Sequence, residues 1–174
     1  MKISKPNVEN LSNYLKNYFE LVHETDLIFA LEKDRDEIRS YYTTIPENKG
    51  DYSYAVNKWT SKEVLCHIID AERIFSYRAL RFSRNDKTEL SGYDDDFLVA
   101  NSNTVNRTIS DLLHEFILVR NSTISLFKSM NLNMLELVGT ANNNTISVSS
   151  LGWLIAGHSK HHLSVLLTKY KSGN

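Results

Sequence analysis

Three of the six histidines of this 174-residue chain fall within five residues, in the segment LGWLIAGHSKHHLSVLLTKY at 151–170. His158 and His162 are four residues apart, so on a helix their side chains point the same way, one turn above the other. Both lie in the apolar stripe of this helix, whereas His161 is turned about 100° away from His162. Two imidazoles in this arrangement can bind one metal ion without bending the helix.

A third ligand has to come from elsewhere in the chain, and His67 is the best candidate. The capping box formed by Thr60 and Glu63 predicts that a helix begins at this point and runs to about residue 83. One face of this helix carries Val64, His67, Ala71, Ile74, Phe75 and Arg78. His67 is therefore expected to point inward, as His158 and His162 do. The alternative is that these histidines are hydrogen-bonded core residues and bind no metal.

Two further residues near His67 could take part in chemistry. Asp70 lies one turn along the helix, where it either orients an imidazole through its second ring nitrogen or is a surface charge. Cys66 is turned about 100° away from His67 and is not counted as a ligand.

The composition indicates one soluble globular domain spanning residues 1–174. Lys and Arg number 20 and Asp and Glu number 21, a balance that favours neither nucleic acid nor an anionic membrane as partner. The N-terminal sequence has no signal-peptide core, and no apolar run approaches the roughly 20 residues that span a bilayer. With a single cysteine the chain forms no internal disulfide, so we expect a cytoplasmic protein.

Apolar periodicity predicts an all-α fold, a four-helix bundle with long helices at about 26–44, 60–83, 109–130 and 147–170. A short N-terminal helical extension at about 10–22 is expected to cap the bundle. The connection at 84–108 is long enough to return the chain along the bundle, which would make the second and third helices parallel.

The connecting segments and charged stretches are assigned structural roles. Within the long connection, Asp94 is expected to cap a short helix that ends near Ala100, and the run Asp94–Asp96 is interpreted as capping rather than cation binding. The charges from Glu32 to Arg39, including Asp34, are interpreted as a solvated helix face. Residues 131–146 are expected to form a connection with a short turn of helix and no strand.

Three stretches of the chain match a known pattern in order and separation. They are WTSKEVLCHIIDAERIFSYRALRFSR at 59–84, SGYDDDFLVANS at 91–102 and LIAGHSKHHL at 154–163. Through them, residues 26–170 resemble the DinB superfamily, which includes the YfiT-type proteins. The resemblance implies an up-down-down-up bundle, frequent homodimers, and one divalent ion held by His67, His158 and His162. We expect Zn or Ni, although histidine ligands also suit Cu and Fe.

The resemblance also implies a function, because relatives include thiol-dependent transferases and metal-dependent hydrolases acting on small molecules. Three histidines leave coordination positions for water or substrate. We therefore expect a metal-dependent enzyme, either a hydrolase or a transferase that uses a low-molecular-weight thiol. Glu63 and Asp70 are the nearest carboxylates on the His67 helix, but neither is assigned as catalytic. The alternatives are a non-catalytic metal-binding stress-response protein and a bundle with three buried histidines and no metal.

Overall fold

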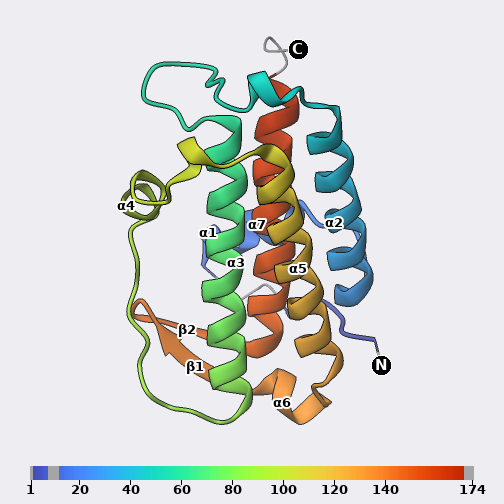
Figure 1. Ribbon diagram of the computed structural model, residues 1–174. Helices are drawn as coiled ribbons and strands as arrows, with labels where there is room; N and C mark the ends of the chain where they lie inside the picture. The colour runs from blue at the N-terminus through green and yellow to red at the C-terminus, as the bar shows by residue number, and fades with distance from the viewer. Residues whose placement is uncertain (1, 8–11, 171–174) are drawn as a thin grey trace.

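The computed structural model describes residues 2–7 and 12–170, and its centre is a bundle of four long helices (Figure 1). These are α2 (Leu27–Thr44), α3 (Ser61–Ser83), α5 (Ile109–Lys128) and α7 (Val148–Lys169). In Figure 1, α2 and α7 run up the bundle while α3 and α5 run down it, so the order is up-down-down-up. This confirms the predicted fold class and the parallel arrangement of α3 and α5.

Side-chain caps determine where the long helices begin. Asp26 accepts from two amides of the first turn of α2, and Ser147 accepts from the third residue of α7. Thr60 and Thr108 form capping boxes with Glu63 and Asp111, respectively, at the starts of α3 and α5. These contacts satisfy backbone amides that have no partner within the helix.

The connection from α3 to α5 climbs the outside of the bundle, as Figure 1 shows. It contains α4 (Asp95–Ala100) and the 3₁₀ turn η2 (Thr104–Asn106), and α4 packs against α3. Asp94 caps α4 through the amide of Phe97, as predicted. The connection therefore does more than return the chain, because it places α4 beside the N-terminal half of α3 (Figure 1).

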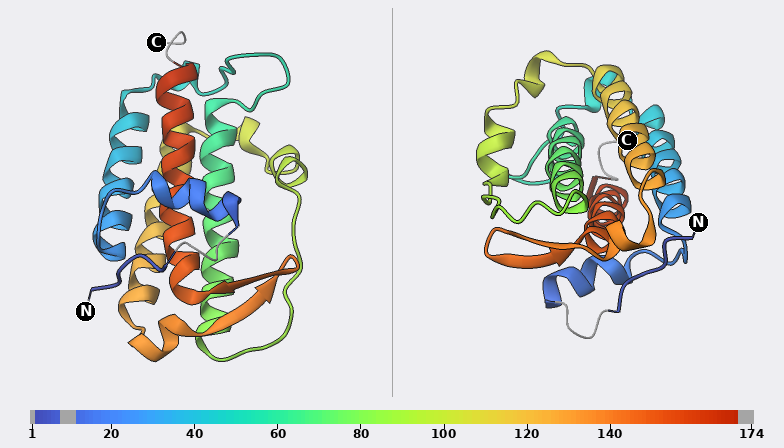
Figure 2. Two further views of the ribbon diagram at one scale, coloured as in Figure 1. Left: turned by 180° about the vertical axis from the view of Figure 1, so that it is seen from behind. Right: turned by 90° about the horizontal axis from the view of Figure 1, so that it is seen from below.

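A short helix, α1 (Asn13–Glu20), crosses the bundle and packs on α7, as seen in Figure 2. The predicted extension at about 10–22 begins before it, and residues 8–11 lie outside the described part of the chain. The crossing is close because position 157 is glycine. A Cβ atom at Gly157 would lie 2.3 Å from the carbonyl oxygen of Tyr18, so any side chain there would push α1 away.

Between α5 and α7 the structure contains a β-hairpin that the sequence analysis did not predict. It follows α6 (Leu132–Glu136) and consists of β1 (Val138–Ala141) and β2 (Asn144–Ser147), which are antiparallel. Both turn residues, Asn142 and Asn143, have positive φ, a conformation that asparagine tolerates better than most residues. Leu90 of the connection pairs with Ala141, so the hairpin is held against the long connection.

Two apolar clusters fill the bundle. The first is centred on Phe82, Phe127 and Trp153, and the second on Tyr42, Phe116 and Leu166. Between them lies a buried polar layer to which each long helix contributes one residue: Asp34, Glu72, Arg120 and Ser159.

Arg120 joins the polar layer together. Its Nε lies 2.9 Å from Glu72 Oε1, and its Nη1 lies 2.6 Å from Asp34 Oδ2 and donates to the carbonyl of Leu31. Its Nη2 donates to Ser159 Oγ, which in turn donates to Asp34. One guanidinium group thus links α5 to the other three long helices.

The position of Asp34 corrects the sequence analysis, which assigned the stretch from Glu32 to Arg39 to a solvated face. Asp34 is 0% exposed. It follows Leu27 by seven residues and precedes Ile38 by four, so it lies in the apolar stripe of α2 rather than among its charged neighbours. Burial raises the pKa of Asp34, and the charge of Arg120 opposes that effect.

None of the described helices is both long enough and apolar enough to span a lipid bilayer.

Candidate metal centre

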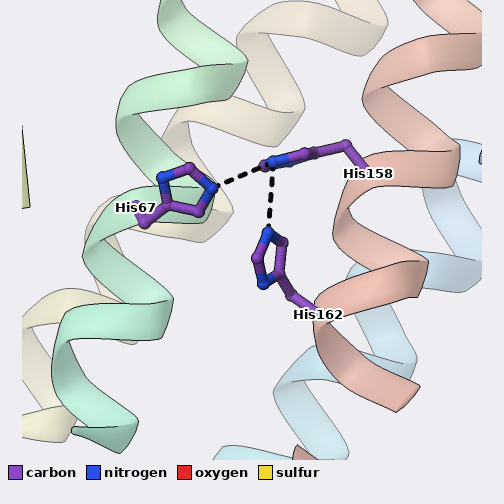
Figure 3. A group of neighbouring side chains, drawn as sticks. All are labelled: His67, His158 and His162. Carbon is purple, nitrogen blue, oxygen red and sulfur yellow. Dashed lines mark hydrogen bonds between the residues drawn. The ribbon is translucent and has the colours of Figure 1, made fainter. Parts of the chain in front are cut away.

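The three predicted ligands come together in the structure. His67 projects from α3 toward His158 and His162 on α7 (Figure 3). The Nε2 atom of His158 lies 3.0 Å from Nε2 of His67 and 3.2 Å from Nε2 of His162. The potential ligand atoms of all three residues lie within 4.8 Å of one another.

This arrangement suits a shared cation better than it suits hydrogen bonding. The Nε2 atom of a neutral imidazole either donates one proton or accepts one, yet Nε2 of His158 faces two other Nε2 atoms. Nitrogen ligands held about 2.0–2.1 Å from one ion at tetrahedral to octahedral angles are roughly 2.9–3.4 Å apart. The two short distances at His158 fall in that range, so the donor set fits a metal ion.

Burial keeps the three rings neutral, which leaves lone pairs available for an ion. His67 and His158 are each 5% exposed. Burial lowers the pKa of His67 to about 4 against the opposing charge of Asp96. Burial also lowers the pKa of His162 to about 3, and the charges of His67 and His161 add to this effect. The pKa of His158 lies well below its usual value, again chiefly because of burial.

Asp95 of α4 approaches the other nitrogen of His67. Its Oδ1 lies 3.5 Å from His67 Nδ1, at the outer limit of hydrogen-bonding distance. A carboxylate at this position favours the proton on Nδ1 and leaves the lone pair on Nε2, which faces the other histidines. Asp95 therefore occupies the orienting position that the sequence analysis considered for Asp70.

Asp70 and Glu63, the carboxylates considered from sequence, are engaged elsewhere. Asp70 pairs with Arg73 at 3.7 Å and lies 3.8 Å from the sulfur of Cys66, while Glu63 accepts the amide of Thr60 in the helix cap. Burial and the nearby Asp70 raise the pKa of Cys66 to about 11, so its thiol stays protonated at neutral pH.

Aromatic rings surround the histidines. Trp59 lies 4.6 Å from His67 between ring centroids, and Tyr18 and Phe75 each lie 5.8 Å from His158. These rings limit the access of water to the cluster, which strengthens electrostatic interactions there. His161, which the sequence analysis turned about 100° away from His162, is exposed and contacts Tyr18 edge to face, and His114 of α5 is exposed as well.

A cavity of about 600 Å³ lies beside the cluster, within the size range of small-molecule sites. Its walls come from α1, α3, α7, the long connection and the hairpin, and include Leu15, Phe75, Arg78, Tyr93, Asp95 and Leu154. Asp95 and Phe75 contact both the cavity and the histidines, so a molecule in the cavity can lie next to the cluster.

Sequence reasoning found the histidines but missed Asp95, Trp59 and Tyr18. The histidines share the inward phase of long helices, which periodicity reveals. Asp95 was hidden because its neighbour Asp94 is a helix cap, and the whole acidic run was given that role. Tyr18 lies on a short helix, whose own periodicity does not show that it packs against α7 at Gly157.

Comparisons with known proteins agree with this fold. A sequence model of the DinB superfamily matches residues 30–166. A search of curated protein sequences found no match. Among solved structures, the chain is similar to YfiT from Bacillus subtilis, described as "a probable metal-dependent hydrolase with an unusual four-helix bundle topology". The TM-score is 0.74 at 14% sequence identity, and the match covers 97% of this chain and 93% of YfiT.

Proposed function

The chain belongs to the DinB superfamily, and we propose that it is a metal-dependent enzyme that acts on a small molecule bound in the cavity beside His67, His158 and His162. The observation that carries this proposal is the convergence of three Nε2 atoms on one point. Three nitrogen ligands leave coordination positions open, as catalytic ions require and purely structural ones do not.

A divalent ion held by these residues would supply a Lewis acid that lowers the pKa of a bound water or thiol. The side chains of the chain have complementary tasks. Asp95 holds the proton of His67 on Nδ1, and Trp59, Tyr18 and Phe75 keep bulk water from the histidines. The ligand set is compatible with Zn or Ni.

The nucleophile is either water, which makes the protein a hydrolase, or a low-molecular-weight thiol, which makes it a transferase. The protein does not supply the thiol from Cys66. That side chain is buried, its thiol stays protonated at neutral pH, and it is directed toward Asp70. A transferase would therefore need a thiol cosubstrate.

Turnover of activated esters, with and without added small thiols, tests the proposal on metal-loaded and chelated protein. We expect the loaded protein to react faster, Cys66→Ser to leave the rate unchanged, and His158→Ala to abolish it while helical content is retained. The thiol dependence of the rate identifies the nucleophile.

Activity that is lost in Cys66→Ser and kept in His158→Ala would contradict the proposal. Stoichiometric metal binding without turnover of any ester or thiol electrophile would instead favour the non-catalytic metal-binding protein.

A further inference from the structure

Arg78 is a buried cation without a carboxylate partner. It is only 8% exposed, and none of the described carboxylates forms an ion pair with it. The other buried Asp, Glu, Lys and Arg side chains of the described ranges 2–7 and 12–170 all have an oppositely charged partner: Glu24, Asp34, Lys62, Glu72 and Arg120. Burying a charge without a counter-charge is costly, so Arg78 calls for an explanation.

The guanidinium of Arg78 is held in place, but only one of its three nitrogens donates a hydrogen bond to a described residue. Its Nη2 donates to the carbonyl of Ser91 at 2.9 Å, and the group lies over the rings of Phe75 and Tyr93, at 5.9 and 5.5 Å from their centroids. Its Nε and Nη1 make no hydrogen bond to any described residue. Arg78 also lines the 600 Å³ cavity, so these donors are available to a molecule inside it.

We propose that Arg78 binds an oxyanion group, a carboxylate or a phosphate, on the molecule that occupies this cavity. A planar guanidinium with free donors binds such groups with two parallel hydrogen bonds. This inference deepens the proposed function and rests on it for the identity of the occupant as substrate. The binding itself does not require the metal ion.

The spacing along α3 defines the shape of the ligand. Arg78 follows His67 by 11 residues, which places it on the same face of the helix and about 16 Å further along the axis. Phe75 lies between them, with its ring 5.8 Å from that of His158 and also against Arg78. A fitting ligand has an anionic end at Arg78, an apolar middle over Phe75, and its reacting bond toward the histidines.

Other cavity residues favour the same orientation. Tyr14 and Tyr93 also line the cavity, and burial raises the pKa of Tyr93 so that its hydroxyl remains a neutral donor. Asp95 lines the cavity beside His67, so in the metal-free protein its negative charge disfavours an anion at that end and favours one at Arg78.

The test uses three probes with one apolar ring: phenylacetate, phenyl phosphate and the neutral phenylacetamide. Each is titrated into the full-length protein, as purified and after chelation, while side-chain Nε–H resonances are recorded by NMR. The Arg78 resonance is the one that disappears in Arg78→Lys. We expect at least one anion to shift it and to bind about tenfold or more tightly than the amide, with or without metal. The tighter of the two anions identifies the carboxylate or the phosphate as the group recognised.

Arg78→Met should lose this preference for the anion, whereas Arg84→Met, which removes an exposed arginine just beyond the end of α3, should keep it. If Arg78→Met does not fold, the test rests on whether the anions shift the wild-type Arg78 resonance, which Arg78→Lys identifies. Equal binding of anions and amide, an unshifted Arg78 resonance, or an anion preference retained in Arg78→Met would each overturn the inference. If the protein binds the anion through Arg78 but takes up no metal and turns over no substrate, the role of Arg78 stands and only the proposed function is refuted.

Discussion

The proton on His67 decides which of its two ring nitrogens is free to bind a metal ion. Its Nε2 faces His158 and its Nδ1 faces Asp95, so the two ring nitrogens have different neighbours. The carboxylate attracts the proton to Nδ1, and the free lone pair then lies where the other two histidines point. Asp95 contributes to the site without being a ligand.

Replacing Asp95 with asparagine should therefore weaken metal binding by about 10–100-fold, the usual cost of removing a carboxylate that orients a metal-bound histidine. Competition with a chromophoric chelator measures the affinity directly. Asp70→Asn provides the matched control, because this carboxylate is engaged with Arg73 and Cys66 and should leave the affinity unchanged. If Asp70→Asn weakened binding and Asp95→Asn did not, the role given to Asp95 would be wrong.

For single residues, the sequence predicts the direction of a side chain where that residue lies on a long helix. His67, His158 and His162 each lie in an apolar stripe, and a period of 3.6 residues is enough to turn all three inward. Asp95 belongs to a six-residue helix in a 25-residue connection. Periodicity does not determine the path of such a segment, so its approach to His67 could not be predicted.

Among the helices, the central feature is a buried charge network rather than continuous apolar packing. Arg120 of α5 binds Asp34 of α2, Glu72 of α3 and Ser159 of α7, between the two apolar clusters. Ser159 directly follows His158, so the network also fixes the rotation and height of α7 at the candidate ligands His158 and His162.

Arg120→Met should destabilise the protein by about 3–5 kcal/mol, because it leaves two carboxylates buried without a cation. Urea denaturation followed by circular dichroism measures this loss. Lys128→Met is the control, since it removes an exposed ion pair with Glu32 and should cost less than about 1 kcal/mol.

A triple variant, Arg120→Met with Asp34→Leu and Glu72→Leu, should be more stable than Arg120→Met alone, because it removes the uncompensated charges as well. A triple variant less stable than the single one would show that the carboxylates stabilise the bundle by themselves, contrary to this account.

The ends of the long helices could be predicted to within a few residues, because a side-chain cap such as that formed by Thr60 and Glu63 is a local signal. The hairpin could not be predicted, since strands of four residues are too short to show a clear alternating pattern and the turn between them is two asparagines. Asp34 and Arg120 were missed for a third reason. A charge within an apolar stripe is explained only by its partner on another helix, and the sequence does not show which helices face each other.

In the whole molecule, the parallel arrangement of α3 and α5 forces a long connection, and that connection completes the site. It carries α4 and Asp95 to His67 and, with α1 and the hairpin, lines the cavity. The bundle thus supplies the histidines, while the added segments supply the orienting carboxylate and the walls. That the chain forms a homodimer stays a prediction, which light scattering in solution would test.

The central claim, that three histidines hold one divalent ion, is tested most directly by metal content. The protein is purified without an affinity tag, dialysed with zinc or nickel, freed of excess ion, and measured by elemental analysis. The account predicts one ion per chain for the wild type, His114→Ala and His161→Ala, and a loss of binding in each of His67→Ala, His158→Ala and His162→Ala. A wild type that retains no ion, or ligand variants that retain a full equivalent, would contradict it.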